Sequence, residues 1–392
     1  MKRTLMLAGL LALAACSQAP VAPASSADLS VQRISTAADD RAVELAVHTG
    51  SGMVYALTDA YRMDESSSDV FLRRYNRSGS VIWTQKLDNE AYSSANALAT
   101  DAGGNLYVSY NDTLEKRRSD GGVVWSRTVL GVSALEADQS GNVFVGSGDG
   151  AGTMFLSKYT AAGSRAWSRS VGGQGIFTVS NGLATDAAGN VYAAVSDYDD
   201  CCLWNKLLKY SPSGRQLVNK EIGASSGDVE LKDVVVSGNA LYLAGELHSS
   251  WEFNPDVPSD VDGLLIKLSL TGAEGWRKVF GTSETDAVNA LTADGGGNLY
   301  LTGYTFGNLG GVQPGGSDAF LRKYSPGGSA VWTKQIGSAG DDAGNAVVAY
   351  SSGELYLAGE AGGAFVGSTH RGAQDAFLRR TDGNGNRIWT DQ

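Results

Sequence analysis

Apolar and polar residues alternate in short runs along most of the chain, and turn residues separate these runs. Residues 288–336 show the pattern most clearly. They read VNALTA, DGGGN and LYLTG, then after a longer connection AFLRKY, SPGG and AVWTKQI. Alternation with a period of two predicts half-buried strands, and Gly and Asn supply the positive φ that tight hairpins need. We therefore expect four antiparallel strands in this segment.

The same four-strand pattern occurs seven times. The aromatic residue of the second strand falls at Tyr55, Tyr107, Phe144, Tyr192, Tyr242, Tyr300 and Tyr356, which is a spacing of about 50 residues. The fourth strand carries Trp83, Trp125, Trp167, Trp276, Trp332 and Trp389, with Leu217 in place of Trp in the fourth copy. We expect these tryptophans to lie in the core. Repeats of this length are typical of β-propellers and repeat arrays.

Seven consecutive meanders without helices between them are best buried as blades around an axis. A flat array would leave long sheet edges exposed, and solenoid repeats are usually shorter than these. The predicted fold is therefore all-β, a seven-bladed β-propeller of four-stranded antiparallel blades over residues 29–392. Residues 29–34 resemble a fourth strand, and we expect them to add to the outer edge of the last blade and tie the ends together.

Two long stretches carry a family resemblance. DAFLRKYSPGGSAVWTKQIGSAGDDAGNAVVAYSSGELYLAG at 318–359 and DGLLIKLSLTGAEGWRKVFGTSETDAVNALTADGGGNLYLTGYT at 262–305 resemble the SBBP-type bacterial β-propeller repeat. The resemblance covers nearly all of residues 39–389 and is weaker in the second to fourth copies. It implies the propeller fold. It carries no catalytic motif to this chain, because the positions that the family shares are turn and core residues.

The first residues, MKRTLMLAGLLALAAC, have the features of a targeting segment. Lys2 and Arg3 form a positive start, and the apolar run that follows is too short to span a bilayer. The sequence LAAC ending at Cys16 resembles a bacterial lipobox, which implies cleavage before Cys16 and lipidation of its sulfur. An ordinary secretory signal is the alternative. We expect residues 1–16 to be the signal with its lipidated Cys, residues 17–28 to be a flexible tether, and the protein to be anchored in the cell envelope, outside the cytoplasm.

The formal net charge is −11, which argues against binding to nucleic acid or to an anionic lipid surface. Cys201 and Cys202 are adjacent, so in an oxidising compartment they either form a vicinal disulfide or remain two free thiols. Adjacent cysteines without a nearby His do not match a metal site. The three histidines, which include His248, lie far apart in sequence, so no metal site is expected.

The sequence contains no H-E-x-x-H and no phosphate-binding glycine loop, and we expect no cofactor. The D-x-x-G-N turns alternate Asp and Asn oxygens as calcium loops do, but they lack a closing bidentate Glu. We interpret them as turns.

In a propeller, the second-to-third loops and the blade connections share one face, and here they are long and irregular. Irregular loops on a regular scaffold usually carry function. We assign Tyr198, Trp204, His248, Trp251 and Phe253 of the fourth and fifth copies to this face as candidate ligand-binding residues, because exposed aromatic rings beside carboxylates suit a protein or glycan partner. Alternatively, these rings only cover the blade ends.

The sequence therefore predicts an envelope-anchored binding or scaffold module for a protein or glycan. The alternative is an extracytoplasmic carbohydrate-active hydrolase or lyase. Paired carboxylates in the central funnel, one of them with a raised pKa, would favour the enzyme. A dry channel with an aromatic rim would favour the binding module.

Overall fold

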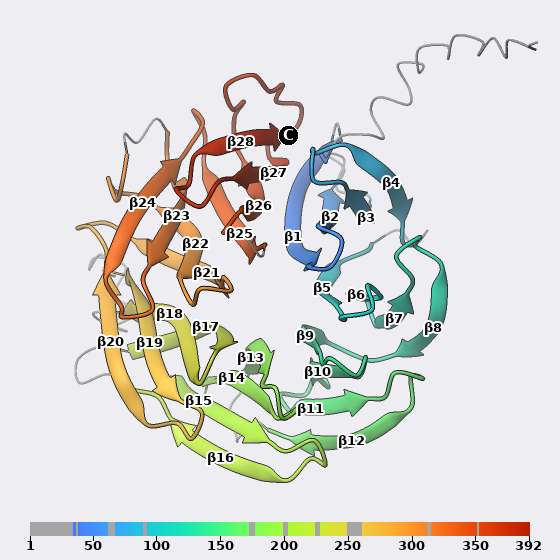
Figure 1. The fold of residues 1–392 in the computed structure, drawn as a ribbon. Helices are drawn as coiled ribbons and strands as arrows, with labels where there is room; N and C mark the ends of the chain where they lie inside the picture. The colour runs from blue at the N-terminus through green and yellow to red at the C-terminus, as the bar shows by residue number, and fades with distance from the viewer. Residues whose placement is uncertain are drawn as a thin grey trace, which may run out of the picture.

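The computed structural model describes residues 34–36, 38–61, 67–88, 92–171, 177–198, 203–223, 228–248, 261–311, 315–350 and 353–392. These residues form seven four-stranded antiparallel sheets, and in each sheet the strands lie in chain order. No helix occurs among them, and hence none long and apolar enough to cross a membrane. The sheets surround a central axis (Figure 1), so the predicted seven-bladed β-propeller is confirmed.

Each blade takes its four strands from one continuous stretch of chain. Blade one holds β1 (Asp39–His48), β2 (Met53–Tyr61), β3 (Ser68–Tyr75) and β4 (Val81–Lys86); blade two holds β5 (Ala95–Thr100), β6 (Leu106–Tyr110), β7 (Thr113–Arg117) and β8 (Val123–Thr128). Blade three holds β9 (Val132–Ala137), β10 (Val143–Gly148), β11 (Met154–Tyr159) and β12 (Arg165–Ser170); blade four holds β13 (Phe177–Thr185), β14 (Val191–Tyr198), β15 (Leu203–Tyr210) and β16 (Gln216–Glu221). Blade five holds β17 (Asp228–Ser237), β18 (Ala240–His248), β19 (Val261–Ser269) and β20 (Glu274–Phe280). Blade six holds β21 (Asp286–Ala293), β22 (Leu299–Thr305), β23 (Asp318–Tyr324) and β24 (Ala330–Ile336); blade seven holds β25 (Asp342–Ala349), β26 (Leu355–Ala361), β27 (Asp375–Thr381) and β28 (Arg387–Asp391).

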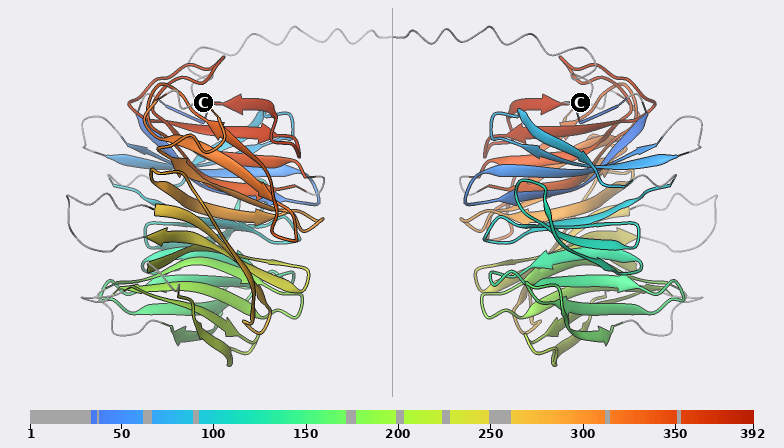
Figure 2. Two further views of the ribbon diagram at one scale, coloured as in Figure 1. Left: turned by 90° about the vertical axis from the view of Figure 1, so that its left-hand side faces the viewer. Right: turned by 90° about the vertical axis from the view of Figure 1, so that its right-hand side faces the viewer.

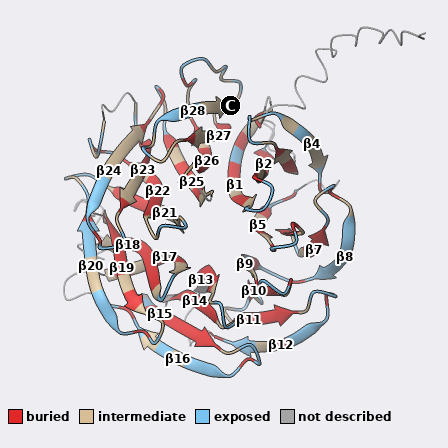
Figure 3. Ribbon diagram, viewed as in Figure 1, coloured by how far each residue is buried: buried red, intermediate tan, exposed pale blue. Residues whose placement is uncertain are grey.

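The first strand of every blade lies at the axis and the fourth lies at the rim (Figure 1). Each first strand contacts the first strands of the two neighbouring blades, including β1 with β25. Seen from the side, the strands run between the two ends of a disc (Figure 2). The second and third strands are the most buried and the rim strands the most exposed (Figure 3), as expected when blades pack face to face.

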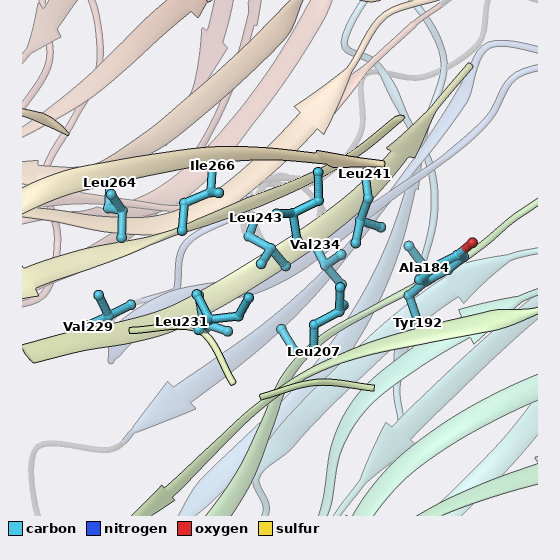
Figure 4. Close-up of a cluster of buried hydrophobic side chains, with 13 residues drawn as sticks. Ala184, Tyr192, Leu207, Val229, Leu231, Val234, Leu241, Leu243, Leu264 and Ile266 are labelled. Carbon is cyan, nitrogen blue, oxygen red and sulfur yellow. The ribbon is translucent and has the colours of Figure 1, made fainter. Parts of the chain in front are cut away.

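The hydrophobic core lies between neighbouring blades. In one such interface, Leu207 of blade four faces Leu231, Leu243 and Leu264 of blade five, all at most 1% exposed (Figure 4). Burial of one such Leu side chain contributes about 1.5–3 kcal/mol. Successive side chains of a middle strand enter the interfaces on opposite sides of its blade, as Leu299 and Leu301 do on one side and Tyr300 on the other.

Each repeat tryptophan joins its blade to the next one. The Trp167 ring contacts Phe144 at a centroid distance of 5.9 Å, and its Nε1–H donates to the Pro212 carbonyl of blade four (3.0 Å). Gly214 has φ +78°, and a Cβ there would lie 2.8 Å from the Trp167 ring, so this turn must be glycine. Only two of these rings, Trp125 and Trp167, are buried. The other four are half-buried but pack against the cores between blades, so the expectation that all lie in the core holds fully only for Trp125 and Trp167.

Among the described residues, blades seven and one each take all four strands from their own stretch of chain, and side chains close the ring between them. The Ile34 N–H and the Tyr75 hydroxyl both donate to Asp391 of β28 (3.2 and 3.3 Å). Glu354 of blade seven bridges Arg77 of blade one (2.5 Å) and Arg380 (2.6 Å). The segment expected to form an extra strand lies outside the described residues except for Ile34, which is not in a strand.

Candidate functional site

The two ends of the disc differ in their connections. At one end, which we call the long-loop end, the second-to-third loops meet the connections between blades. The Gly362 N–H donates to the Asp341 carbonyl (2.8 Å), and the Asp342 N–H donates to that of Ser317 (2.8 Å). The opposite end holds the tight turns, and we call it the short-turn end. The expected division of loops between two faces is therefore confirmed.

The aspartates of the short-turn end are occupied by their own turns. Asp101 Oδ1 accepts the N–H groups of Gly103 and Asn105 (both 2.9 Å), and Asp101 Oδ2 accepts the Asn105 amide (2.8 Å). These bonds and Lys116 lower the pKa of Asp101, although burial opposes them. Asp138, Asp186, Asp294 and Asp382 accept the same turn bonds. The D-x-x-G-N motif is thus used as turn chemistry.

The central channel is a cavity of about 290 Å³ lined by first strands. Each blade carries a β-bulge where the first strand pairs with the second, for example between Leu231 and Asp233, and a bulge re-aims a side chain. The bulge residues Ser133, Lys232, Asn289 and Asn345 line the channel. Two of these amides also join blades, because Asn289 donates to the Gly344 carbonyl (3.0 Å) and Asn345 to that of Ala42 (3.1 Å).

Three carboxyl groups line the channel, from blades one, three and five. Burial raises the pKa of Glu44 to about 8 and that of Glu136 and Asp233 to about 7, and the charge of Asp233 adds to the shift in the two glutamates. Asp233 accepts the Val234 N–H (2.7 Å) and, across the blade boundary, the Leu291 N–H (2.8 Å). Asp233 therefore links two blades. Glu44, in contrast, accepts the N–H of its own neighbour Leu45 (2.9 Å).

Four charged side chains of blade five gather at the long-loop ends of β17 and β18, and one of them, Lys232, also lines the channel. We call Glu230, Lys232, Glu246 and His248 the mouth cluster. Lys232 Nζ lies 2.6 Å from Glu230 Oε1 and 3.7 Å from Glu246 Oε2. His248 Nε2 lies 3.6 Å from Glu230 Oε2 and 3.4 Å from Glu246 Oε2. Burial lowers the pKa of His248, but the two glutamates outweigh it and raise the pKa to about 9.

Exposed large hydrophobic side chains fall into two groups by their place in the disc. Of the large hydrophobic residues that the structure shows exposed, one group lies on the rim strands: Ile82, Val123, Val124, Leu217, Val279, Val331 and Ile388. The other group lies at the long-loop end: Tyr61, Tyr92, Leu130, Trp204, Phe306 and Val366. All the rim residues except Val279 are the first or second residue of their strand and so lie toward the short-turn end, but none of the tight turns themselves exposes a large hydrophobic residue among the described positions. Phe306 packs edge-on against Tyr304 (5.9 Å between ring centroids). Burial raises the pKa of Tyr304, and the charge of Glu246 adds to this shift.

The structure places two of the five predicted ligand-binding side chains. Trp204 is 45% exposed and lies within β15, not in the loop expected from the sequence. Its loop is shorter because Leu203 and Trp204 pair with Tyr198 and Asp197. His248 ends β18 in the mouth cluster. Tyr198 is the last residue of β14, and its side chain is not among those that the structure describes. The other predicted residues, Cys16, Cys201, Cys202, Trp251 and Phe253, lie outside the described residues.

Sequence reasoning did not identify the channel carboxylates, although the repeat contained a signal. The position after the bulge is occupied by Glu44, Ala97, Ala134, Gly182, Asp233, Ala290 and Ala346 in blades one to seven. A carboxylate stands out where the other blades have Ala or Gly. Gly182 has a steric reason to be glycine, because a Cβ there would lie 2.6 Å from Asp233 Oδ1.

Comparison with known proteins supports the repeat architecture. A PQQ_2 family model, described as outer membrane protein assembly factor BamB, matches residues 68–249, which is less than half of the chain. The regulatory protein FlaEY of Caulobacter vibrioides is 27% identical over 134 residues. That match covers 31% of this chain and 14% of FlaEY, so the chain corresponds to only a small part of this relative.

Several solved structures share the fold. Hydrazine synthase of Kuenenia stuttgartiensis superposes with a TM-score of 0.57 at 12% identity, over 81% of this chain and 92% of that one. The β-propeller domain of the trilobed protease of Pyrococcus furiosus, which has an open velcro topology, gives 0.52 at 10% identity over 90% and 98%. Puromycin hydrolase gives 0.51 at 14% identity over 90% and 54%. These identities show the fold alone. The comparisons thus match a propeller of the PQQ_2 type in part of the chain, and the SBBP-type resemblance stays an expectation.

Proposed function

We propose that this protein is an envelope-anchored scaffold that binds a partner through its long-loop end. The observation that carries the proposal is the uneven distribution of exposed apolar side chains. Trp204, Phe306 and Val366 are 45%, 45% and 85% exposed there. At the opposite end, the described tight turns expose no large hydrophobic residue, and the exposed ones lie on the outer rim strands. Apolar side chains beside charged groups are typical of protein interaction sites.

A protein partner is the preferred choice between the two classes considered. The exposed residues at the long-loop end come from blades one, four, six and seven and from the connections on either side of blade two, so they extend around the ring. A partner that contacts several of them at once needs a broad surface, as a folded protein has. The partial match to the family of an outer membrane assembly factor agrees with this choice and with an envelope location.

Site-specific photo-crosslinking tests the binding face. A photoreactive residue replaces Phe306 or Val366 at the long-loop end, or Val331 or Ile388 on the rim, in cells that express the chain. Val331 and Ile388 are matched controls, because they are 54% and 47% exposed and equally apolar. We expect protein adducts from the long-loop positions only. Equal adducts from the rim positions, or none from the long-loop end, would refute the proposed face.

Anchoring rests on the lipobox-like sequence that ends at Cys16. Since no other apolar segment precedes the propeller, Cys16→Ala should release the chain from membranes. Fractionation after a salt wash measures this. A variant that still sediments with membranes would show that the anchor is not the Cys16 lipid.

A hydrolase or lyase acting on carbohydrate is the second candidate. It is favoured by the carboxyl groups of raised pKa in the channel and by the opposed Glu230 and Glu246 at its mouth, which resemble the carboxylate pairs of glycosidases. Turnover of aryl glycosides that is lost in Glu246→Gln would establish it. Absence of turnover across α- and β-linked substrates would leave the scaffold as the function.

A further inference from the structure

Three potential metal ligands meet in the mouth cluster, although they are separated in sequence. Glu230 of β17 pairs directly with Glu246 of β18, and His248 lies two residues further along β18. Side chains two residues apart on a strand point to the same face. The three side chains are 17%, 8% and 17% exposed, so they are largely shielded from bulk water on two rigid strands.

The spacing of their atoms is that of ligands around one ion. His248 Nε2 lies 3.4 Å from Glu246 Oε2 and 3.6 Å from Glu230 Oε2, and the three ligand atoms all lie within 4.8 Å of one another. Hydrogen bonds from a ring nitrogen are usually shorter, at about 2.7–3.2 Å. Two ligands of a tetrahedral Zn²⁺, each bonded at about 2.0–2.2 Å, are separated by about 3.3–3.6 Å.

We propose that Glu230, Glu246 and His248 bind one divalent transition-metal ion, with Zn²⁺ preferred. A mixed set of imidazole and carboxylate favours Zn²⁺ over Ca²⁺ and Mg²⁺, which prefer oxygen ligands alone. Three protein ligands leave a fourth position for water or a partner's oxygen. This site goes beyond the proposed scaffold function, because partner capture at the long-loop end does not require it.

Lys232 competes with such an ion. Its Nζ lies 2.6 Å from Glu230 Oε1 and 3.7 Å from Glu246 Oε2, so it supplies positive charge between two carboxylates that are directly opposed. Lys232 is also the bulge residue of β17 and lines the channel together with Glu44 and Asp233. An ion at the mouth would displace the ammonium group toward these carboxylates. Removal of Lys232 should therefore strengthen metal binding.

Isothermal titration calorimetry with ZnCl₂ tests the site in the full chain carrying Cys16→Ser, Cys201→Ser and Cys202→Ser, which removes every thiol. We expect one ion per chain, and no uptake of CaCl₂ under the same conditions. Glu246→Gln and His248→Ala should each weaken binding by at least about 100-fold, since even outer-shell partners of a metal site are worth about 10–100-fold. Lys232→Gln should tighten it.

Glu354→Gln is the matched control, because Glu354 also lies between two cationic groups but at the seam of blades seven and one. It should leave Zn²⁺ binding unchanged. Co²⁺ gives an independent readout, because its visible absorption reports low coordination number and nitrogen ligation and should disappear in His248→Ala. Circular dichroism confirms that each variant is folded. No saturable Zn²⁺ binding, or binding that persists in folded His248→Ala, would overturn the proposal, whereas the photo-crosslinking result would stand.

Discussion

Glu44 offers a direct test of the channel electrostatics. Its side chain lines the central channel, and burial, with a smaller contribution from Asp233, raises its pKa from 4.5 to about 8. The folded state therefore holds the proton more tightly than the unfolded state does. Between about pH 4.5 and 8, the unfolded state has lost this proton while the folded state still holds it. The free energy of unfolding therefore falls as the pH rises through this window.

The substitution Glu44→Gln keeps the shape and the acceptor for the Leu45 N–H (2.9 Å in the parent) but removes the charge. A shift from 4.5 to about 8 corresponds to at most about 5 kcal/mol at 1.4 kcal/mol per unit. Because the side chain is partly exposed to the channel, screening reduces this value. We expect a gain of about 1–2 kcal/mol at pH 8.5 and none at pH 4.5.

Calorimetric melting of the parent and of Glu44→Gln at the two pH values measures the effect. For a chain of this length, the expected gain raises the melting temperature by about 1–3 °C at pH 8.5. An equal shift at both pH values, or no shift at either, would refute the reasoning. Asp233→Asn is the contrasting variant. Both Asp233 oxygens accept backbone N–H groups, so at pH 8.5 an amide donor placed there should lose one bond, at about 1–3 kcal/mol, which offsets the gain from removing a charge whose pKa is also raised.

Further predictions concern the contacts between blades, and chemical denaturation measures each. Trp167→Ala should cost about 3–5 kcal/mol, since the ring is 8% exposed and joins two blades. Trp276→Ala should cost clearly less, because its ring is half-buried; equal losses would contradict the assignment of stability to burial. Glu354→Gln should cost about 1 kcal/mol at low salt, and less at high salt, because it removes the charge that joins Arg77 and Arg380. A loss that salt does not change would show that charge is not the cause.

The sequence predicted the architecture because its signals are local. A strand, a tight turn and an aromatic residue such as Tyr300 are each determined by a few neighbouring residues, and repetition made the pattern unambiguous. The mouth cluster was not predicted, because Glu230 and Glu246 are brought together only by the pairing of β17 with β18. His248 was selected for its proximity to aromatic residues in the chain, whereas its described neighbours are glutamates. Trp204 was assigned to a loop because the turn signals around it do not fix where a strand ends.

The bulge in each first strand has a consequence for how this protein can evolve. The extra residue is outside the regular pairing of its strand, so its side chain can change without breaking the ladder of its blade, although Val43 also packs against a core and two asparagines bond a neighbouring blade. Val43, Asn96, Ser133, Asn181, Lys232, Asn289 and Asn345 occupy this place in the seven blades. They range from apolar to cationic within one molecule, and the architecture accommodates them all. Selection can therefore change the chemistry of the channel one blade at a time, while the strand pairing within each blade is inherited intact.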